Sequence, residues 1–285
     1  MNDAAIRVEG LTKYYGAVIG IEDLSFDVQR GEIFGFLGAN GAGKTTTIRL
    51  LLDLLRPSRG SARILGVDCH RDSLAARRQV GYLPGDLPIY PDLSAGDYLS
   101  YLSRLDGRPV EPAYLAHLLR RFDVSDIDRG RRLRVQSHGM KQKIGIIQAL
   151  MARPPVVILD EPTAGLDPMM VQAFRETLSE LKREGRTTVF LSSHVLTEVE
   201  STCDRIGLVR GGRLVTSSTM EEIRRTGTRR VTITFADGHP ATVMEINGPL
   251  GPMLASLNDH PIHDIAVEPF TLEDYIARFY GGAAR

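Results

Sequence analysis

The feature that most constrains this sequence is a glycine-rich stretch set between an apolar run and a helical pattern. It reads Gly38-Ala39-Asn40-Gly41-Ala42-Gly43-Lys44-Thr45-Thr46 and fits G-x-x-x-x-G-K-[ST], the phosphate-binding loop. Ile33 to Leu37 before it predict a buried strand, and Thr47 to Leu52 after it predict a helix with one apolar face. The N–H groups of such a loop and of the helix N-terminus bind phosphate. The sequence therefore predicts an α/β domain with a phosphate site.

Two acidic residues far along the chain complete this site. Val156 to Leu159 are all apolar, as expected of a central parallel strand, and lead directly to Asp160 and Glu161. Ligands bind at the carboxyl ends of strands in open α/β sheets. Two adjacent acids after a strand would, by themselves, more often be a helix cap or a solvated turn. Together with the loop they predict hydrolysis of a nucleoside triphosphate.

In that reaction each candidate residue has a separate role. Lys44 reaches the phosphates as a catalytic cation, while Thr45 and Asp160 hold Mg²⁺. Glu161 is placed to polarise the attacking water as a base.

Composition narrows the possible partners and compartments. The chain has 285 residues, which favours two domains, and its 35 basic and 35 acidic side chains cancel. A net charge of zero argues against nucleic acid as a partner. Cys69 and Cys203 have no pairing or metal-ligand spacing, which fits a reducing cytosol. We find no N-terminal signal and no run of about 18 apolar residues, so a membrane role would require a partner.

The periodicity of the remaining chain predicts three parts. Ile6 to Leu11 read as a strand, followed by a turn that carries Tyr14 and Tyr15. From about residue 87 to 152 the apolar spacing is helical, which indicates a helical subdomain inserted into an α/β domain with a mixed sheet. After about residue 222, two strand patterns flank Asp237-Gly238 and a helical pattern covers Leu272 to Phe279. This last part predicts a small α+β domain.

The order of these motifs resembles the ATP-binding subunits of ABC transporters, and the resemblance runs from about Ile6 to Val215. It implies a P-loop NTPase fold, with a nucleotide-binding domain at 1–222 and an accessory domain at 223–285. It also implies that Tyr15, rather than Tyr14, stacks on adenine. His194, in Ser-Ser-His, matches the switch histidine that contacts the γ-phosphate. The segment from Asp160 to Asp167 matches the hydrolytic strand end and the dimer-contact loop that follows it.

Two segments depart from the family pattern. The signature Leu-Ser-Gly-Gly-Gln is replaced by Gln136-Ser137-His138-Gly139-Met140. Ser137 and Gly139 keep the hydroxyl and the close backbone approach, and Met140 takes the place of the glutamine. By itself this segment would read only as a helix N-cap. The resemblance implies that Ser137, Gly139 and Met140 bind the nucleotide held by a second copy.

The second departure concerns a glutamine that contacts Mg²⁺ and water in the family. Its place, after Val80 to Pro84, is held by Gly85. Asp86 is the nearest replacement for the missing ligand. The alternative, which is slightly favoured, is that Pro84-Gly85-Asp86 is simply a turn with Asp86 in solvent. Ile89, Tyr90 and Leu93 beyond it resemble the surface that faces the permease.

The segment Glu268 to Tyr275 resembles the C-terminal motif of exporter-type ATPases, which include antibiotic and multidrug efflux systems. The resemblance therefore implies a Mg²⁺-dependent ATPase, with ATP and Mg²⁺ as cofactors, that forms a head-to-tail homodimer. It would drive a separate integral membrane permease from the cytoplasmic face of the membrane, as a peripheral subunit. The cargo would be a drug, an antibiotic or another small lipophilic compound, and no nucleic acid would be bound.

Two other functions also use a phosphate loop. One is a soluble ABC-type ATPase that acts on ribosomes or nucleic acid, which the single cassette and the absence of a basic arm disfavour. The other is a GTPase or a small-molecule kinase. The sequence lacks the Asn-Lys-x-Asp motif that reads guanine, and neither activity explains Ser137 to Met140.

Overall fold

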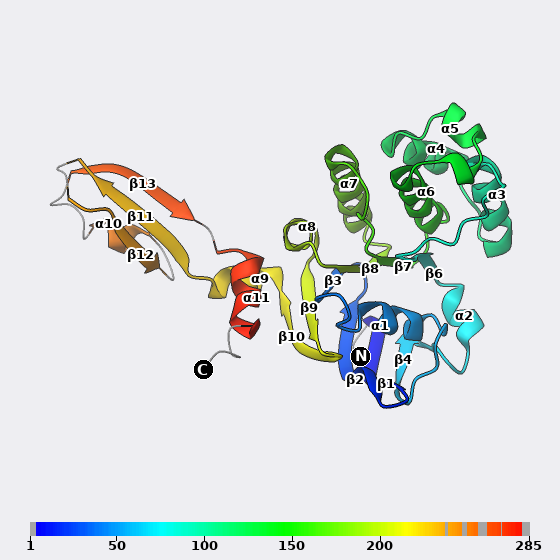
Figure 1. The fold of residues 1–285 in the computed structure, drawn as a ribbon, viewed down its shortest axis with the longest axis horizontal. Helices are drawn as coiled ribbons and strands as arrows, with labels where there is room; N and C mark the ends of the chain where they lie inside the picture. The colour runs from blue at the N-terminus through cyan, green and yellow to red at the C-terminus, as the bar shows by residue number, and fades with distance from the viewer. Residues whose placement is uncertain (1–3, 237–238, 247–249, 256–260, 269, 281–285) are drawn as a thin grey trace. The chain divides into compact units, whose positions relative to one another are not determined.

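A computed structural model describes residues 4–236, 239–246, 250–255, 261–268 and 270–280 (Figure 1). The chain divides into two compact units, Met1–Ser217 and Ser218–Arg285. The division falls five residues before the boundary expected at residue 222, because the short helix α9 (Met220–Thr226) belongs to the second unit. Within the described residues, no helix is both long enough and apolar enough to cross a membrane.

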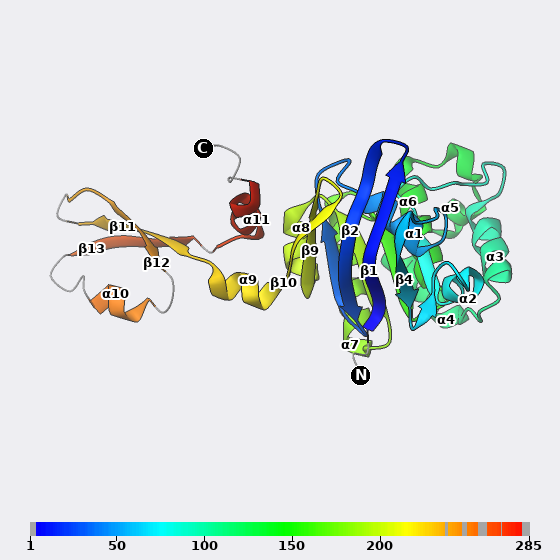
Figure 2. The same ribbon diagram turned by 90° about the horizontal axis from the view of Figure 1, so that it is seen from below.

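The first unit begins with a four-stranded sheet in the order β2-β1-β4-β5. Its strands are β1 (Ala4–Tyr15), β2 (Val18–Gln29), β4 (Arg59–Ile64) and β5 (Val67–Asp68). The pairs β1–β2, β1–β4 and β4–β5 are antiparallel. Figure 2 shows β1 and β2 running side by side. The strand predicted at Ile6 to Leu11 is longer than expected, because pairing with β2 continues to Tyr15 opposite Val18. Placing Tyr14 and Tyr15 in a turn was therefore wrong.

A second sheet of six strands has the order β10-β9-β3-β8-β7-β6. The strands are β3 (Ile33–Leu37), β6 (Val80–Leu83), β7 (Val156–Asp160), β8 (Thr188–Ser193), β9 (Arg205–Arg210) and β10 (Arg213–Thr219). All residues of β3, β7 and β8 are buried, as their apolar runs predict. These three strands pair in parallel, so their carboxyl ends meet at one edge.

The two sheets share a core of aromatic side chains. Phe26 of β2 stacks on Phe34 of β3 with ring centroids 5.7 Å apart, and Phe190 of β8 lies 5.9 Å from Phe34. Ile48 and Leu51 of helix α1 (Lys44–Leu51) are buried in the same cluster. The core thus fixes β3, α1 and the loop between them as one block. The prediction of an α/β fold with a mixed-sheet core is confirmed.

Between β6 and β7 the chain is helical, as predicted for residues 87–152. The elements are α3 (Ala95–Asp106), α4 (Pro112–Arg121), α5 (Asp126–Gly130), a 3₁₀ turn (Leu133–Val135) and α6 (His138–Leu150). They pack together through buried side chains that include Leu99, Leu118, Phe122 and Ile144. Figure 1 shows α3 to α6 gathered away from β1, β2 and β4. The remaining helices of the first unit are α2 (Ser73–Arg77), α7 (Pro168–Glu184) and α8 (Leu196–Thr202).

The second unit contains a three-stranded antiparallel sheet in the order β12-β11-β13. Its strands are β11 (Arg229–Phe235), β12 (Thr242–Ile246) and β13 (Ile262–Glu268), with helices α10 (Gly251–Ala255) and α11 (Leu272–Tyr280). Val231 and Ile233 are fully buried against Met253 of α10 and neighbouring apolar side chains. This is the small α+β part that the sequence predicts, although Asp237-Gly238 lies outside the described residues.

Candidate active site

The phosphate loop joins the carboxyl end of β3 to the N-terminus of α1. Gly43 caps α1 with a φ of 110°, a backbone angle that residues other than glycine rarely adopt. A Cβ at Gly38 would lie 2.5 Å from the Val209 carbonyl oxygen, and one at Gly43 would lie 2.6 Å from the side chain of Ile21. Close packing therefore requires glycine at both places, and the backbone conformation requires it at Gly43 as well.

Lys44 is the first residue of α1, and its side chain reaches back to the start of the loop. Its side chain is only 6% exposed, and its Nζ donates a hydrogen bond to the Gly38 carbonyl oxygen over 2.7 Å. The same Nζ lies 3.2 Å from Oε1 of Glu161, which makes an ion pair between a buried ammonium group and a partly exposed carboxylate. A phosphate bound in the loop would compete with Glu161 for this ammonium group, because both are anions.

Thr45 and Asp160 lie next to one another although they are far apart in the sequence. The Thr45 hydroxyl donates to Oδ2 of Asp160 over 2.9 Å, and Ser192 of β8 donates to Oδ1 over 2.5 Å. Asp160 is 2% exposed, and each of its two carboxylate oxygens accepts one of these hydrogen bonds. A hydroxyl and a carboxylate fit Mg²⁺, which takes oxygen ligands from water and phosphate as well. The described residues hold no cluster of three or more His, Cys, Asp or Glu side chains suited to a metal.

Glu161 has an unusual backbone at the end of β7. Its φ is 51°, in the left-handed region that a residue with a side chain rarely occupies. Its N–H is hydrogen-bonded to the Ser192 hydroxyl over 3.1 Å, and its Oε2 lies 2.7 Å from Nδ1 of His194. Strained backbone of this kind is typical of functional sites. The structure therefore brings Lys44, Glu161 and His194 into direct contact.

Tyr15 lies near the phosphate loop at the end of β1. Its ring is so close to Gly20 that a Cβ at Gly20 would be 2.7 Å from Cε2, and the carbonyl of Gly20 would lie 3.0 Å from a Cβ at Gly43. Tyr15 is 45% exposed, with the Lys13 ammonium 5.5 Å from its ring centre. Tyr14, in contrast, donates its hydroxyl to Glu22 over 3.0 Å. That hydrogen bond is the main reason why the pKa of Tyr14 is raised.

The segment from Ser137 to Met140 forms the start of α6. The Ser137 hydroxyl accepts a hydrogen bond from the Met140 N–H over 3.2 Å, so Ser137 is the N-cap of the helix. A Cβ at Gly139 would lie 2.8 Å from the Gly165 carbonyl oxygen, so this contact needs glycine. Lys44 bonds to Gly38 and Glu161, whereas Ser137 bonds to Met140. Among the described residues, these bonds do not connect the phosphate loop to the segment from Ser137 to Met140.

Comparison with known proteins decides the family. A match to the ABC transporter family covers residues 21–164, which include the phosphate loop, Asp160 and Glu161. The chain belongs to the ABC transporter family. The predicted resemblance is confirmed, and the chain is an ATP-binding subunit with the fold of an ABC ATPase.

The similarity of this ABC protein to its relatives extends beyond residues 21–164. The chain is 33% identical over 241 residues to the bacitracin transport ATP-binding protein BcrA of Bacillus licheniformis, covering 84% of this chain and 78% of the relative. It is 30% identical over 267 residues to the linearmycin resistance ATP-binding protein LnrL of Bacillus subtilis (strain 168), covering 92% and 84%. A solved ATP-binding subunit of an ABC transporter shares 33% identity with a TM-score of 0.71, covering 78% of this chain and 92% of the other.

Gly85, where this ABC protein lacks the family glutamine, lies beside the metal-binding candidates. A Cβ at Gly85 would be 3.4 Å from Oδ2 of Asp160, an ordinary van der Waals contact. Asp86 is exposed and lines a groove instead. Nearby, burial and the charge of Asp160 raise the pKa of Tyr82 to about 12, so its hydroxyl stays neutral.

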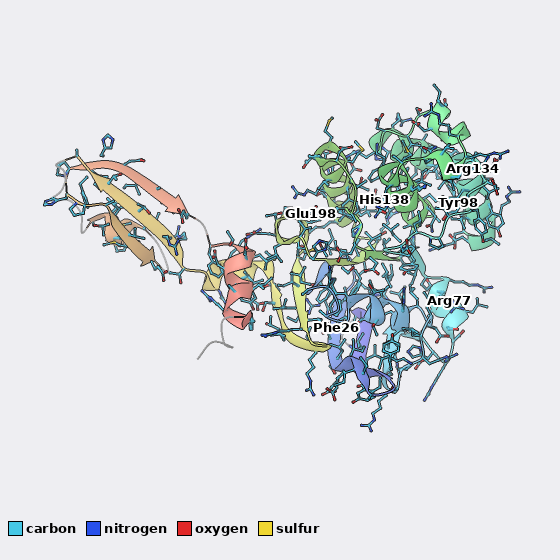
Figure 3. All side chains as sticks on the ribbon, in the orientation of Figure 1. Phe26, Arg77, Tyr98, Arg134, His138 and Glu198 are labelled. Atoms are coloured by element: carbon cyan, nitrogen blue, oxygen red, sulfur yellow. The ribbon has the colours of Figure 1, made fainter. Side chains whose placement is uncertain are left out.

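The sequence predicted only part of this groove, namely the surface at Ile89 and Tyr90. Its volume is about 810 Å³, and it lies between the end of β6 and the helices α3 and α6. Tyr90 and Tyr98 line it with their rings 6.3 Å apart, and the ring of Tyr101, outside the lining, lies 5.5 Å from that of Tyr90. Figure 3 labels Tyr98 in this helical region. Ile89 and Tyr90 line the groove.

Two polar residues of the site were missed by sequence reasoning. Ser192 bonds to both Asp160 and the Glu161 N–H, and the amide of Gln142 in α6 reaches the backbone of Glu161. The Ser-Ser-His run placed Ser192 at a strand end and could have suggested its role. No pattern in the sequence indicates the contact of Gln142.

Proposed function

We propose that this chain hydrolyses ATP with Mg²⁺ to power a separate membrane permease that exports an antibiotic or another small lipophilic compound. The observation that carries the hydrolytic part is the contact of Glu161 with both Lys44 and His194, at distances of 3.2 and 2.7 Å. A base, a phosphate-binding cation and a polar switch residue thus lie together where the phosphate loop would hold the terminal phosphate.

The reaction uses the groups of the chain in a definite order. ATP enters with its adenine against Tyr15 and its phosphates in the loop, where Lys44 exchanges Glu161 for the β- and γ-phosphates. Thr45 and Asp160 would hold Mg²⁺, which neutralises charge on the phosphate oxygens. Glu161, released from Lys44, orients the attacking water and takes its proton, while His194 contacts the γ-phosphate. Ser192 keeps Asp160 and the backbone of Glu161 in register throughout.

A second copy of the chain completes the proposed site. Ser137 and the first N–H groups of α6 are suited to an anion, since a helix N-terminus attracts phosphate. In a head-to-tail dimer they would face the γ-phosphate held by the partner's loop. Closure on ATP and reopening after hydrolysis would then move the helical subdomains.

The groove beside α3 fits the permease as partner. It is largely apolar at Leu87, Ile89 and Leu102, and Tyr90 and Tyr98 also line it. Aromatic side chains in a pocket of this kind typically dominate binding energy at protein interfaces. We place a short helix of the permease in this groove, close to Gly85 and therefore to Asp160. The subunit would then lie on the cytoplasmic face of the membrane.

The cargo is proposed from the relatives alone. BcrA is named for bacitracin transport and LnrL for linearmycin resistance, and both are matched over more than four-fifths of this chain. An antibiotic or a similar amphipathic compound is therefore the cargo class to test first.

The decisive experiment coexpresses the chain with a candidate permease and purifies the complex from membranes. We expect Mg²⁺-dependent ATPase activity that the permease stimulates, and export of an antibiotic by the complex in proteoliposomes. Copurification with ribosomes, and no association with the membrane protein, would contradict the proposal in favour of a soluble ABC ATPase.

A further inference from the structure

Helix α6 touches the site at a second place, one turn beyond Ser137. Gln142 is 3% exposed, and its Nε2 donates to the Pro162 carbonyl oxygen over 2.9 Å and to the Glu161 carbonyl oxygen over 3.3 Å. Both partners can only accept hydrogen bonds, so the side chain has to present its NH₂ group there. The buried amide is therefore committed to the backbone around Glu161.

The first turn of α6 contacts the same loop a few residues later. A Cβ at Gly165 would lie only 2.3 Å from Cδ2 of His138, and one at Gly139 would lie 2.8 Å from the Gly165 carbonyl oxygen. Gly165 has φ of 77°. Helix α6 thus packs on both ends of the segment from Glu161 to Gly165, and Figure 3 labels His138 at its start. A shift of the helix has to displace this segment, because no free space separates them.

The backbone of Glu161 is held between two elements. Its N–H is bonded to the Ser192 hydroxyl of β8, and its carbonyl oxygen is bonded to Gln142 of α6. The strand is buried throughout, whereas α6 begins with the residues proposed to meet the nucleotide of the other copy. A change in φ of Glu161, which lies in the left-handed region, would move its carbonyl group and its Cβ together and so change the direction of the carboxylate.

We propose that Gln142 is a positioning residue that transmits the docking of α6 on the partner's nucleotide to Glu161 of its own chain. The inference rests on the composite dimer site of the proposed function. It adds the route by which nucleotide in one site acts on the other site. ATP in one site draws α6 of the facing copy forward, and Gln142 then sets the carboxylate of that copy's own site. Hydrolysis in one site consequently depends on occupancy of the other.

Two variants test this coupling. Gln142→Leu removes the donor at nearly constant size, and misplacement of a catalytic group by about 1 Å can lower the rate roughly 100-fold. We expect kcat to fall by about 10- to 100-fold, ATP binding to change by less than about 3-fold, and the Hill coefficient to drop from above 1 to 1. The measurements are steady-state ATPase rates, nucleotide binding and the melting temperature.

Gln142→Glu supplies a readout that a merely structural residue would not give. An ionised carboxylate has only acceptors, and it would repel the two carbonyl oxygens, whereas a protonated one has an O–H that can donate. Burial favours the protonated form. The activity of Gln142→Glu relative to wild type should therefore rise as the pH falls from about 8.5 to 6.

The matched controls are Gln172→Leu and Gln172→Glu on helix α7. Gln172 is exposed and bonds only to Glu176 over 3.2 Å, so both variants should match wild type in rate, Hill coefficient and pH profile. The coupling role is wrong if wild type has a Hill coefficient of 1. It is also wrong if Gln142→Leu retains its kcat, or if the Gln142→Glu ratio is constant with pH. Failure of wild type and the Gln172 variants to hydrolyse ATP would instead refute the proposed function itself.

Discussion

Glu161 occupies a position that its own backbone makes costly. A left-handed φ disfavours any side chain there, and the residue is retained between Lys44 and His194 by an ion pair and a hydrogen bond. The Glu161 carboxylate thus has two roles. It pairs with Lys44 in the free protein, and in the proposed reaction it takes the proton of the attacking water. This gives a test that separates binding from chemistry.

Glu161→Gln should reduce ATP hydrolysis by about 10²- to 10⁴-fold, as expected when a positioned base is removed. The same variant should bind ATP at least as tightly as wild type, because the neutral amide no longer competes with phosphate for Lys44. Isothermal titration gives the affinity, and a phosphate-release assay gives the rate. Turnover at the wild-type rate would show that Glu161 is not the base.

Gly85 gives a second test at a single residue. Its backbone is outside the left-handed region and a Cβ there has ordinary contacts, so a larger side chain is sterically acceptable. Gly85→Gln would place an amide oxygen beside Asp160, where it can assist Mg²⁺.

We expect Gly85→Gln to lower the Mg²⁺ concentration needed for half-maximal hydrolysis, and Gly85→Ala to leave it unchanged. A Mg²⁺ titration of wild type and both variants provides the measurement. If Asp86 were the metal ligand instead, Asp86→Ala would raise that concentration. Identical titrations for Gly85→Gln and Gly85→Ala would contradict the placement of a ligand at position 85.

At the scale of elements, local patterns identified the chemistry, whereas contacts between elements decided its arrangement. The phosphate loop and the Asp160–Glu161 strand end are contiguous motifs, so the sequence predicted them. The register that puts Ser192 opposite Asp160 is a property of the β7–β8 pair, and the contact of Gln142 depends on how α6 packs. The length of β1 was underestimated for the same reason, because its pairing with β2 overrides local turn propensity.

Helix α6 and helix α1 supply the two halves of the proposed composite site, and mixed dimers can separate them. Lys44→Ala destroys the phosphate loop of one copy, and Ser137→Arg blocks the α6 N-terminus of the other. Each variant alone should be inactive. A mixture should recover one site per mixed dimer, formed by the intact loop of the Ser137→Arg copy and the intact α6 of the Lys44→Ala copy. Because α6 of the Ser137→Arg copy cannot dock, this site should hydrolyse ATP about 10- to 100-fold more slowly than a wild-type site, yet measurably above either variant alone.

Phosphate release after mixing and refolding the two variants is the measurement, with mixed dimers verified by distinct affinity tags. A mixture of Lys44→Ala with itself is the control. Absence of activity in verified mixed dimers would argue that each site is built from a single chain.

At the scale of the whole molecule, a substitution in the groove at α3 should abolish transport without changing the ATPase activity of the isolated subunit. Tyr90 is half exposed and contacts the rings of Tyr98 and Tyr101, so it should dominate binding of the permease. Tyr90→Ala should keep the basal ATPase rate of the isolated subunit and lose stimulation and transport in the complex. Ile127→Ala, at an exposed apolar residue on α5, serves as the control and should retain all three activities. Normal transport with Tyr90→Ala would place the permease elsewhere.

The position of Tyr15 beside the phosphate loop has a practical consequence, because the chain contains no tryptophan. Tyr15→Trp would create a single indole whose emission comes from the nucleotide site alone. Adenine stacked on that ring should quench its fluorescence, so one cuvette would report arrival and departure of the nucleotide in real time. Stopped-flow traces with ATP and ADP would measure both rates, and an emission unchanged by saturating ATP would show that Tyr15 does not contact the base.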